Sequence, residues 1–339
     1  MMTPESNSVL SADNPLVDPR DDRLGYAEFA RHLAESICKM ATTEGLVVTI
    51  YGPWGSGKTT LLHFVVHYVR QKPENEQPII VYFNPWWFSG REDLIRRFFD
   101  QLLATLSEGR LVAKDLTKQI ADFAEVVSEA PSAHIAFLGK FIKHFVRRRD
   151  VPQLKAKIKS ALEKQKKRIL VVIDDVDRLT ADEIRQLFCV IKAIADFPKV
   201  VYLLAFDREV VIRALSEAQG IPGEAYLEKI VQVSFEIPLP DKTSLRELLF
   251  ERLNAILAGT LNEAFDQTYW GNVYFDGIDH FITKPRDIVR LTNTLSITYN
   301  VVKGEVNPID FIAIETLRVF CPLVYDIIRK NPKSFAGHN

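Results

Sequence analysis

The sequence predicts an α/β fold, in which a parallel five-stranded sheet is covered by helices and followed by a smaller all-helical domain. Five short apolar runs have strand length, and segments with a helical pattern separate them. Because these runs are apolar throughout, both faces of the sheet are expected to be buried, which is typical of parallel sheets. The predicted strands are Leu46–Tyr51, Ile79–Phe83, Ile169–Ile173, Val200–Phe206 and Val231–Ile237.

Helical periodicity accounts for the segments between the strands. The second and third strands are separated by 85 residues, more than one crossover needs, so we expect a helical insertion over residues 110–165. Its amphipathic patterns predict helices at Leu111–Val127, Ile135–Arg149 and Leu154–Lys167. The other helices of this part are predicted at 21–42, 58–71, 91–106, 180–196 and 208–218.

The strand signals stop after Pro238-Leu239-Pro240, and the chain beyond them has a helical pattern only. We therefore expect a core over residues 21–240, a helical domain over 241–330 and a frayed tail over 331–339. Residues 1–20 are polar, which indicates a disordered or loosely draped arm. The helices of the C-terminal domain are predicted at 243–258, 261–270, 274–282, 286–301 and 308–329.

The composition excludes several classes of protein. The 339 residues are 47% hydrophobic and 26% charged, with a net charge of −1, so no overall field attracts the chain to nucleic acid or membrane. Cys38, Cys189 and Cys321 lie too far apart for a metal-ligand motif and suit a reducing compartment. No window approaches the roughly 18–20 apolar residues of a membrane span, and the N-terminus has no apolar signal core. These features predict a soluble, cytoplasmic protein.

A phosphate-binding loop follows the first predicted strand. Residues 52–59 read GPWGSGKT and match G-x-x-x-x-G-K-[ST], with a helix expected directly after them. The backbone N–H groups of such a loop and the N-terminus of the helix form a cradle for phosphate oxygens. Lys58 is expected to contact the β- and γ-phosphates, and the Thr59 hydroxyl is a ligand for Mg²⁺. The candidate nucleotide-binding residues are Gly52, Pro53, Trp54, Gly55, Ser56, Gly57, Lys58, Thr59 and Thr60.

Two carboxylates follow the third predicted strand, at the edge of a parallel sheet where ligands bind. Asp174 is predicted to hold the Mg²⁺ shell, usually through water. Asp175 is predicted to polarise the attacking water, since phosphoryl transfer needs positioning and charge stabilisation more than covalent chemistry. The alternative, that the pair caps a helix, is less compatible with the phosphate loop upstream.

Further polar residues have two possible roles each. Asp207, after the fourth strand, is a candidate sensor of the γ-phosphate or the cap of the helix that begins at Arg208, and these roles do not exclude each other. Arg286 opens a helix of the C-terminal domain and is a candidate lid arginine that reaches the nucleotide phosphates. Arg178 and Arg208 compete for that role, and any of the three is alternatively a surface ion pair.

Two surface features remain open. Trp86 and Trp87 lie at a strand-to-helix corner, where we expect core packing at the sheet edge, and the alternative is an aromatic surface for a partner. Between Lys143 and Arg168 there are eleven basic and two acidic residues. A solvated helix face explains this basic run as well as a nucleic-acid contact does.

The ordered set of motifs resembles the KAP family of P-loop ATPases. The segments that carry the resemblance are GPWGSGKTT, FNPWWFSG, VVIDDVDRL, AFDREVV, YLEKIVQVSFEIPLP and KPRDIVRLTN, and it runs from about Asp18 to Ile328. It implies a P-loop NTPase sheet of order 5-1-4-3-2, ATP as ligand and kinship with AAA+ and signalling ATPases. The resemblance also implies the phosphate-loop roles of Lys58 and Thr59, and the Mg²⁺ and water roles of Asp174 and Asp175. Asp177 and Arg178 complete the D-D-x-D-R motif of the family. Residues Asp21–Gly25 match a family segment that would fold near the adenine.

The chain departs from the family in one place. Many members carry transmembrane helices between the two ATP motifs, whereas residues 110–165 of this chain are basic and not apolar enough, so no membrane function is carried over. The resemblance implies a Mg²⁺-dependent, ATP-hydrolysing switch and, through its phage-exclusion members, anti-phage defence. A DNA-engaging AAA+-like ATPase that uses the basic insertion, and a non-hydrolysing ATP-binding scaffold, stay open as alternatives. A homo-oligomer or an effector-protein partner is expected.

Overall fold

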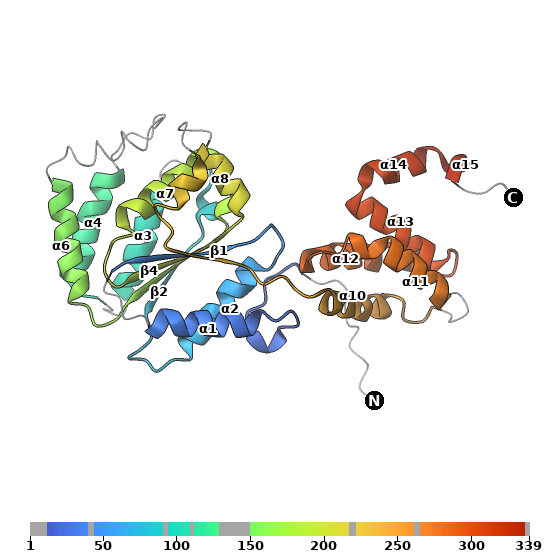
Figure 1. Cartoon of the computed structure of the whole chain (residues 1–339), viewed down its shortest axis with the longest axis horizontal. Coiled ribbons are helices and arrows are strands. Elements are labelled where there is room, and N and C mark those ends of the chain that lie inside the picture. The colour runs from blue at the N-terminus through green and yellow to red at the C-terminus, as the bar shows by residue number, and fades with distance from the viewer. Residues whose placement is uncertain are drawn as a thin grey trace. The chain divides into compact units, whose positions relative to one another are not determined.

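The computed structural model describes residues 12–39, 44–90, 94–108, 112–128, 150–216, 222–260 and 265–335. They form two compact units (Figure 1). The sheet unit comprises the described residues of 16–20 and 26–237. The helical unit comprises those from 238 onward together with 21–25 and the described residues before Leu16.

The sheet unit contains five parallel strands in the order β2-β3-β4-β1-β5, which confirms the predicted order and fold class. The central strands are buried on both faces, as their continuous apolar sequence predicts, whereas β5 at the edge is only alternately covered. β5 is also shorter than predicted, although Gln232 and Ile237 on either side still hydrogen-bond to β1 through their backbone N–H groups. The strands are β1 (Leu46–Tyr51), β2 (Ile79–Phe83), β3 (Ile169–Ile173), β4 (Val200–Phe206) and β5 (Val233–Glu236).

Helices cover the sheet, and their ends follow local capping chemistry. The helix predicted from residue 21 begins only at Tyr26, after Gly25 in a left-handed conformation. At α7, the Thr180 hydroxyl accepts from the Glu183 N–H while the Glu183 carboxylate accepts from the Thr180 N–H, a capping box that satisfies two free helix donors. The helices are α1 (Tyr26–Lys39), α2 (Lys58–Arg70), α3 (Leu94–Ser107), α4 (Lys114–Ser128), α6 (Asp150–Glu163), α7 (Ala181–Ile194), α8 (Arg208–Ser216) and α9 (Gly223–Leu227).

The inserted helices α4 and α6 belong to the main hydrophobic core. They lie side by side next to α3 (Figure 1). Phe123 of α4 contacts Phe99 of α3 and Phe197 edge to face, and Ile158 of α6 is fully buried in the same cluster. The predicted helix Ile135–Arg149 lies outside the described residues. The described part of the insertion thus extends the core of the sheet unit.

The helical unit packs around Leu249, Tyr274 and Leu291. Its elements differ from the prediction in two places. In place of helices at 261–270 and 274–282, one helix begins after Asp266, which caps it, and ends at Asp276, before Gly277. Residues 261–264 are not described. The helix predicted over 308–329 is broken at Pro322, which has no N–H to continue it. The helices are α10 (Lys242–Ile256), α11 (Gln267–Asp276), α12 (Pro285–Val302), α13 (Pro308–Phe320), α14 (Pro322–Lys330) and α15 (Pro332–Phe335), the last within the predicted tail.

The described residues contain neither a membrane-spanning helix nor a disulfide bond. None of their helices combines the length and the apolar content that crossing a bilayer requires. The three cysteines, all within the described ranges, are free thiols, as their spacing predicts.

Gly45 lies close to the backbone that follows α7. A Cβ built there would lie 2.1 Å from the carbonyl oxygen of Ala195 and 2.6 Å from that of Phe197. We therefore expect Gly45→Ala to lower the free energy of unfolding by about 1–3 kcal/mol through overpacking. The measurement is denaturant unfolding. Gly271→Ala in α11 is the matched control, because nothing lies within 4 Å of a Cβ there. It should be neutral or stabilising, and equal stability of the Gly45 variant and wild type would contradict the packing argument.

Candidate nucleotide-binding site

The phosphate loop between β1 and α2 depends on glycine geometry. Gly55 and Gly57 have φ values of 82° and 91°, in the left-handed region that glycine adopts without steric cost. A Cβ on Gly57 would lie 2.9 Å from the ring of Tyr26, whose hydroxyl donates a 2.8 Å hydrogen bond to the Ser56 carbonyl oxygen. Tyr26 therefore supports the loop from behind. The sequence offered no sign of this, because Tyr26 simply occupies an apolar position of α1.

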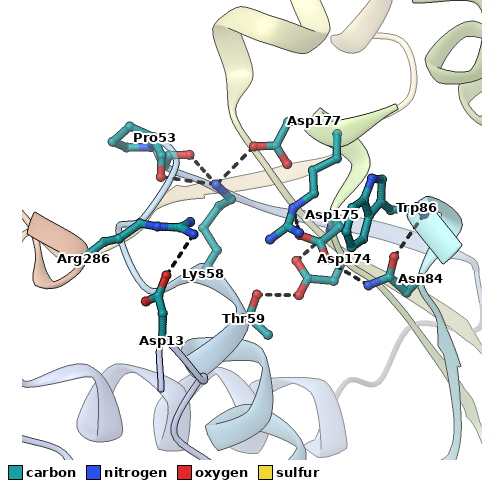
Figure 2. Close-up of polar contacts among 12 residues, drawn as sticks. Asp13, Pro53, Lys58, Thr59, Asn84, Trp86, Asp174, Asp175, Asp177 and Arg286 are labelled. Atoms are coloured by element: carbon teal, nitrogen blue, oxygen red, sulfur yellow. Dashed lines mark hydrogen bonds and ion pairs between the residues drawn. The ribbon is translucent and has the colours of Figure 1, made fainter. Parts of the chain in front are cut away.

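Lys58 is held inside the loop. Its ammonium group donates to the carbonyl oxygens of Gly52 at 2.9 Å and Pro53 at 3.3 Å, and it pairs with the Asp177 carboxylate at 3.3 Å (Figure 2). Both charged side chains are nearly buried, with 8% of Lys58 and 7% of Asp177 exposed. The three N–H donors of the ammonium group thus have three acceptors.

Thr59 and Asp174 meet as the metal prediction requires. The Thr59 hydroxyl donates a 2.6 Å hydrogen bond to Asp174, whose other oxygen accepts from the Asp175 N–H at 2.8 Å (Figure 2). Burial raises the pKa of the Asp174 carboxyl, because the charged form loses hydration. No cluster of three or more His, Cys, Asp or Glu side chains able to hold a metal occurs in the described ranges. A Mg²⁺ ion at this position would rely on these two oxygen donors together with phosphate and water oxygens.

Asp175 is held by two donors. It has a left-handed backbone, with φ at 55°, and begins the 3₁₀ turn Val176–Arg178. Its carboxylate accepts from the Asn84 amide at 2.8 Å and pairs with the Arg178 guanidinium at 2.7 Å. The guanidinium lies over the ring of Trp86, 4.7 Å from its centroid. The candidate water-orienting carboxylate is therefore tied to the end of β2.

The expectation of core packing is wrong for the paired tryptophans. Trp86 is 47% and Trp87 71% exposed, whereas Phe88 stacks against Phe83 in the core. The reason is the short 3₁₀ turn Pro85–Phe88, which Asn84 caps by accepting from the Trp86 N–H at 3.0 Å. In this turn Pro85 is buried and Phe88 packs against the core, whereas Trp86 and Trp87 are left exposed.

The other loop residues bear on whether the loop fits a phosphate. Ser56 Oγ is buried yet has no hydrogen-bond partner in the described structure, so a polar atom of the loop is left for a ligand. The Thr60 hydroxyl accepts from the Leu16 N–H at 3.1 Å, so the described part of the N-terminal arm contacts α2. Trp54 is 57% exposed at the loop surface. The glycine conformations, the buried lysine and the orphan hydroxyl together fit a phosphate ligand.

The remaining candidate residues have their own local partners. Asp207 accepts from the Glu209 N–H at 3.1 Å and so caps α8, while Arg208 pairs with Glu224. Arg286 belongs to the helical unit, where it pairs with Asp13 at 2.8 Å.

Residues 21–25, expected near an adenine, also belong to the helical unit. Within it, Arg23 pairs with Glu251 at 2.9 Å. In the basic run, Lys155 and Lys159 both pair with Asp196, at 2.9 and 2.6 Å, and residues 143–149 lie outside the described ranges.

The raised pKa of Asp174 leads to a stability prediction. A carboxyl whose pKa is raised in the folded state stabilises the fold at low pH, and this contribution is lost as the pH rises through the folded-state pKa. Asp174→Asn removes the buried charge and keeps both contacts, because the Thr59 hydroxyl accepts as well as donates.

We expect the nucleotide-free Asp174→Asn variant to have a higher Tm than wild type at pH 7. The difference should shrink towards about pH 4, near the ordinary pKa of an aspartate. Thermal unfolding across this range measures it. A difference that does not depend on pH would contradict burial of the charged carboxylate as its cause.

The chain is similar to several known proteins. The Phage T7 exclusion protein of Escherichia coli (strain K12) is 26% identical over 347 residues, which cover 93% of this chain and 47% of that protein. The chain thus spans about half the length of that relative.

Among solved structures, the ORC2 protein of Aeropyrum pernix in its ADP form has a TM-score of 0.48 and 14% identity over 98% of this chain and 79% of that one. Drosophila ORC bound to DNA has a TM-score of 0.46 and 14% identity over 91% of this chain and 62% of that one. The KAP family P-loop domain matches residues 26–302, and the chain therefore belongs to the KAP family of P-loop NTPases.

Proposed function

We propose that this KAP-family chain binds ATP with Mg²⁺, hydrolyses it and acts as a conformational switch. The observation that supports this most is the phosphate loop, whose Thr59 hydroxyl lies 2.6 Å from Asp174. Two segments far apart in the sequence thus converge, and the proposal assigns one as the phosphate cradle and the other as the source of the metal-binding carboxylate. A non-hydrolysing scaffold would need the cradle but not the acidic residues beside it.

Each residue has a separate task in this proposal. Lys58 donates to the β- and γ-phosphate oxygens, and Thr59 and Asp174 hold the Mg²⁺ ion, which neutralises charge on the phosphates when bound. Asp175 orients the attacking water and accepts its proton. Asp207, at the end of β4, senses the terminal phosphate through its second carboxylate oxygen while the first caps α8.

The partners of Asp175 set the orientation of its carboxylate. Asn84 and Arg178 donate to different oxygens, and each of these oxygens can accept a second hydrogen bond, from water. A bound partner that changes these contacts at the end of β2 would reorient the carboxylate and so make hydrolysis respond to that partner, as a switch requires. We also propose that Arg286 leaves Asp13 to contact phosphate when the helical unit responds to nucleotide.

We infer the biological role from the relative and not from the geometry of the site. The relative from Escherichia coli is a phage exclusion protein, which supports a role of this chain in anti-phage defence. A homo-oligomer or an effector protein would receive the signal of the switch. DNA engagement through the basic insertion has less support, because Lys155 and Lys159 are both paired with Asp196.

Nucleotide binding is tested first. Lys58→Ala should weaken Mg·ATP affinity by roughly 10- to 150-fold, because hydrogen bonds to charged groups contribute about 1.5–3 kcal/mol. Trp54 lies exposed in the loop, so its fluorescence reports binding. Lys118→Ala, which changes an exposed lysine of α4, is the control and should bind as wild type does. Equal affinity of the Lys58 variant and wild type would remove the basis of the proposal.

Hydrolysis is tested with Asp175→Asn. Asparagine tolerates the left-handed backbone of this position, whereas alanine would add strain. The amide cannot accept the proton of water as a carboxylate does, so we expect ATP binding to persist and turnover to fall by about 100-fold or more. Phosphate release at saturating ATP measures this. Wild-type turnover in the variant would show that another group orients the water.

A further inference from the structure

The third acidic residue of the site, Asp177, has a partner that the proposed mechanism does not use. Its carboxylate lies 3.3 Å from the ammonium group of Lys58. Among the described contacts it is the only charged acceptor of that group, since the others are the carbonyl oxygens of Gly52 and Pro53. Lys58 is the residue expected to bind phosphate, so Asp177 is paired with the ammonium group that a phosphate oxygen would contact.

The backbone explains how Asp177 comes to this position. Asp175 is left-handed, and the 3₁₀ turn that follows sends successive side chains in different directions. Asp175 faces Asn84 and Arg178, and Val176 enters the hydrophobic core. Asp177 then faces the phosphate loop (Figure 2). The side chains of the three acidic residues after β3 thus contact different groups: Asp174 contacts Thr59, Asp175 contacts Asn84 and Arg178, and Asp177 contacts Lys58.

Burial of the Lys58–Asp177 ion pair means that each charge needs a partner. Lys58 and Asp177 are nearly inaccessible, so a charge left without a partner there would be costly. Without a ligand, Asp177 neutralises Lys58. When phosphate oxygens approach, they compete with the carboxylate for the same ammonium group.

We propose that Asp177 is the counter-ion of Lys58 in the nucleotide-free loop and limits nucleotide affinity by competing with phosphate. This rests on the proposed nucleotide binding and adds a positioning residue to it. Removing the charge of Asp177 should therefore strengthen binding, the opposite of what removing a ligand-binding residue does. The effect should act through Lys58 alone.

The experiment compares Asp177→Asn with wild type by calorimetric titration of Mg·ADP and of a slowly hydrolysed Mg·ATP analogue. We expect the Kd to fall by about tenfold, which corresponds to about 1.4 kcal/mol. Asp177→Glu restores the charge and should return the Kd towards the wild-type value. Asp182→Asn is the matched control on α7, since its exposed carboxylate pairs only with Arg185 among the described contacts, and it should bind as wild type does. Asp177→Ser serves as a second neutral variant if the asparagine variant does not fold.

A double-mutant cycle isolates the pair. In a Lys58→Ala background, Asp177→Asn should change the Kd by less than about twofold. A wild-type chain that binds no nucleotide would overturn the proposed function and this inference together. If wild type binds but Asp177→Asn has the same or weaker affinity, the inference alone fails. Loss of turnover at saturating ATP with unchanged affinity would instead make Asp177 a group that acts on water, and would also overturn the counter-ion role.

Discussion

The parallel register of the three central strands is the constraint on which the site depends. β4 lies between β1 and β3, with Phe206 opposite Tyr51 and Leu204 opposite Ile173. The phosphate loop and the acidic segment therefore leave the same edge of the sheet, two strand spacings or about 10 Å apart. The loop bridges that distance and delivers Thr59 to Asp174. Any shift in register would separate the two segments.

The elements of this fold that can be predicted from sequence are those with a local signal. The strands were predictable because their side chains are apolar without interruption, and residues 52–59 because the pattern requires glycine at fixed positions. The edge strand of the sheet and the end of a helix were harder to predict. β5 is partly exposed and short, and the break at Pro322 interrupts a periodicity that otherwise continues. The position of Trp86 and Trp87 at a strand-to-helix corner predicts core packing, although a four-residue turn exposes them.

The contacts within the site had no such signal. Asn84 meets Asp175 across 91 positions of sequence, and Lys58 meets Asp177 across 119. These contacts depend on side-chain directions set by the left-handed backbone of Asp175, an unusual conformation for a residue other than glycine. Residue type and order placed Asp174 and Asp175 near the loop. They could not show that Asp175 is already bonded or that a third carboxylate neutralises the lysine.

The order of the strands in the sheet also has a consequence for folding of the chain during its synthesis. β1 is the fourth strand across the sheet, and its partners β4 and β5 are both encoded much later, with Val47 bonded to Gln232 across 185 residues. At typical rates of translation, β4 and β5 are synthesised on the order of 10 s after this apolar strand. Parallel pairing at such separation is slow, and an unpaired apolar strand is prone to associate with other chains. The arrangement that assembles the site thus makes the nascent chain dependent on protection while its sheet is incomplete.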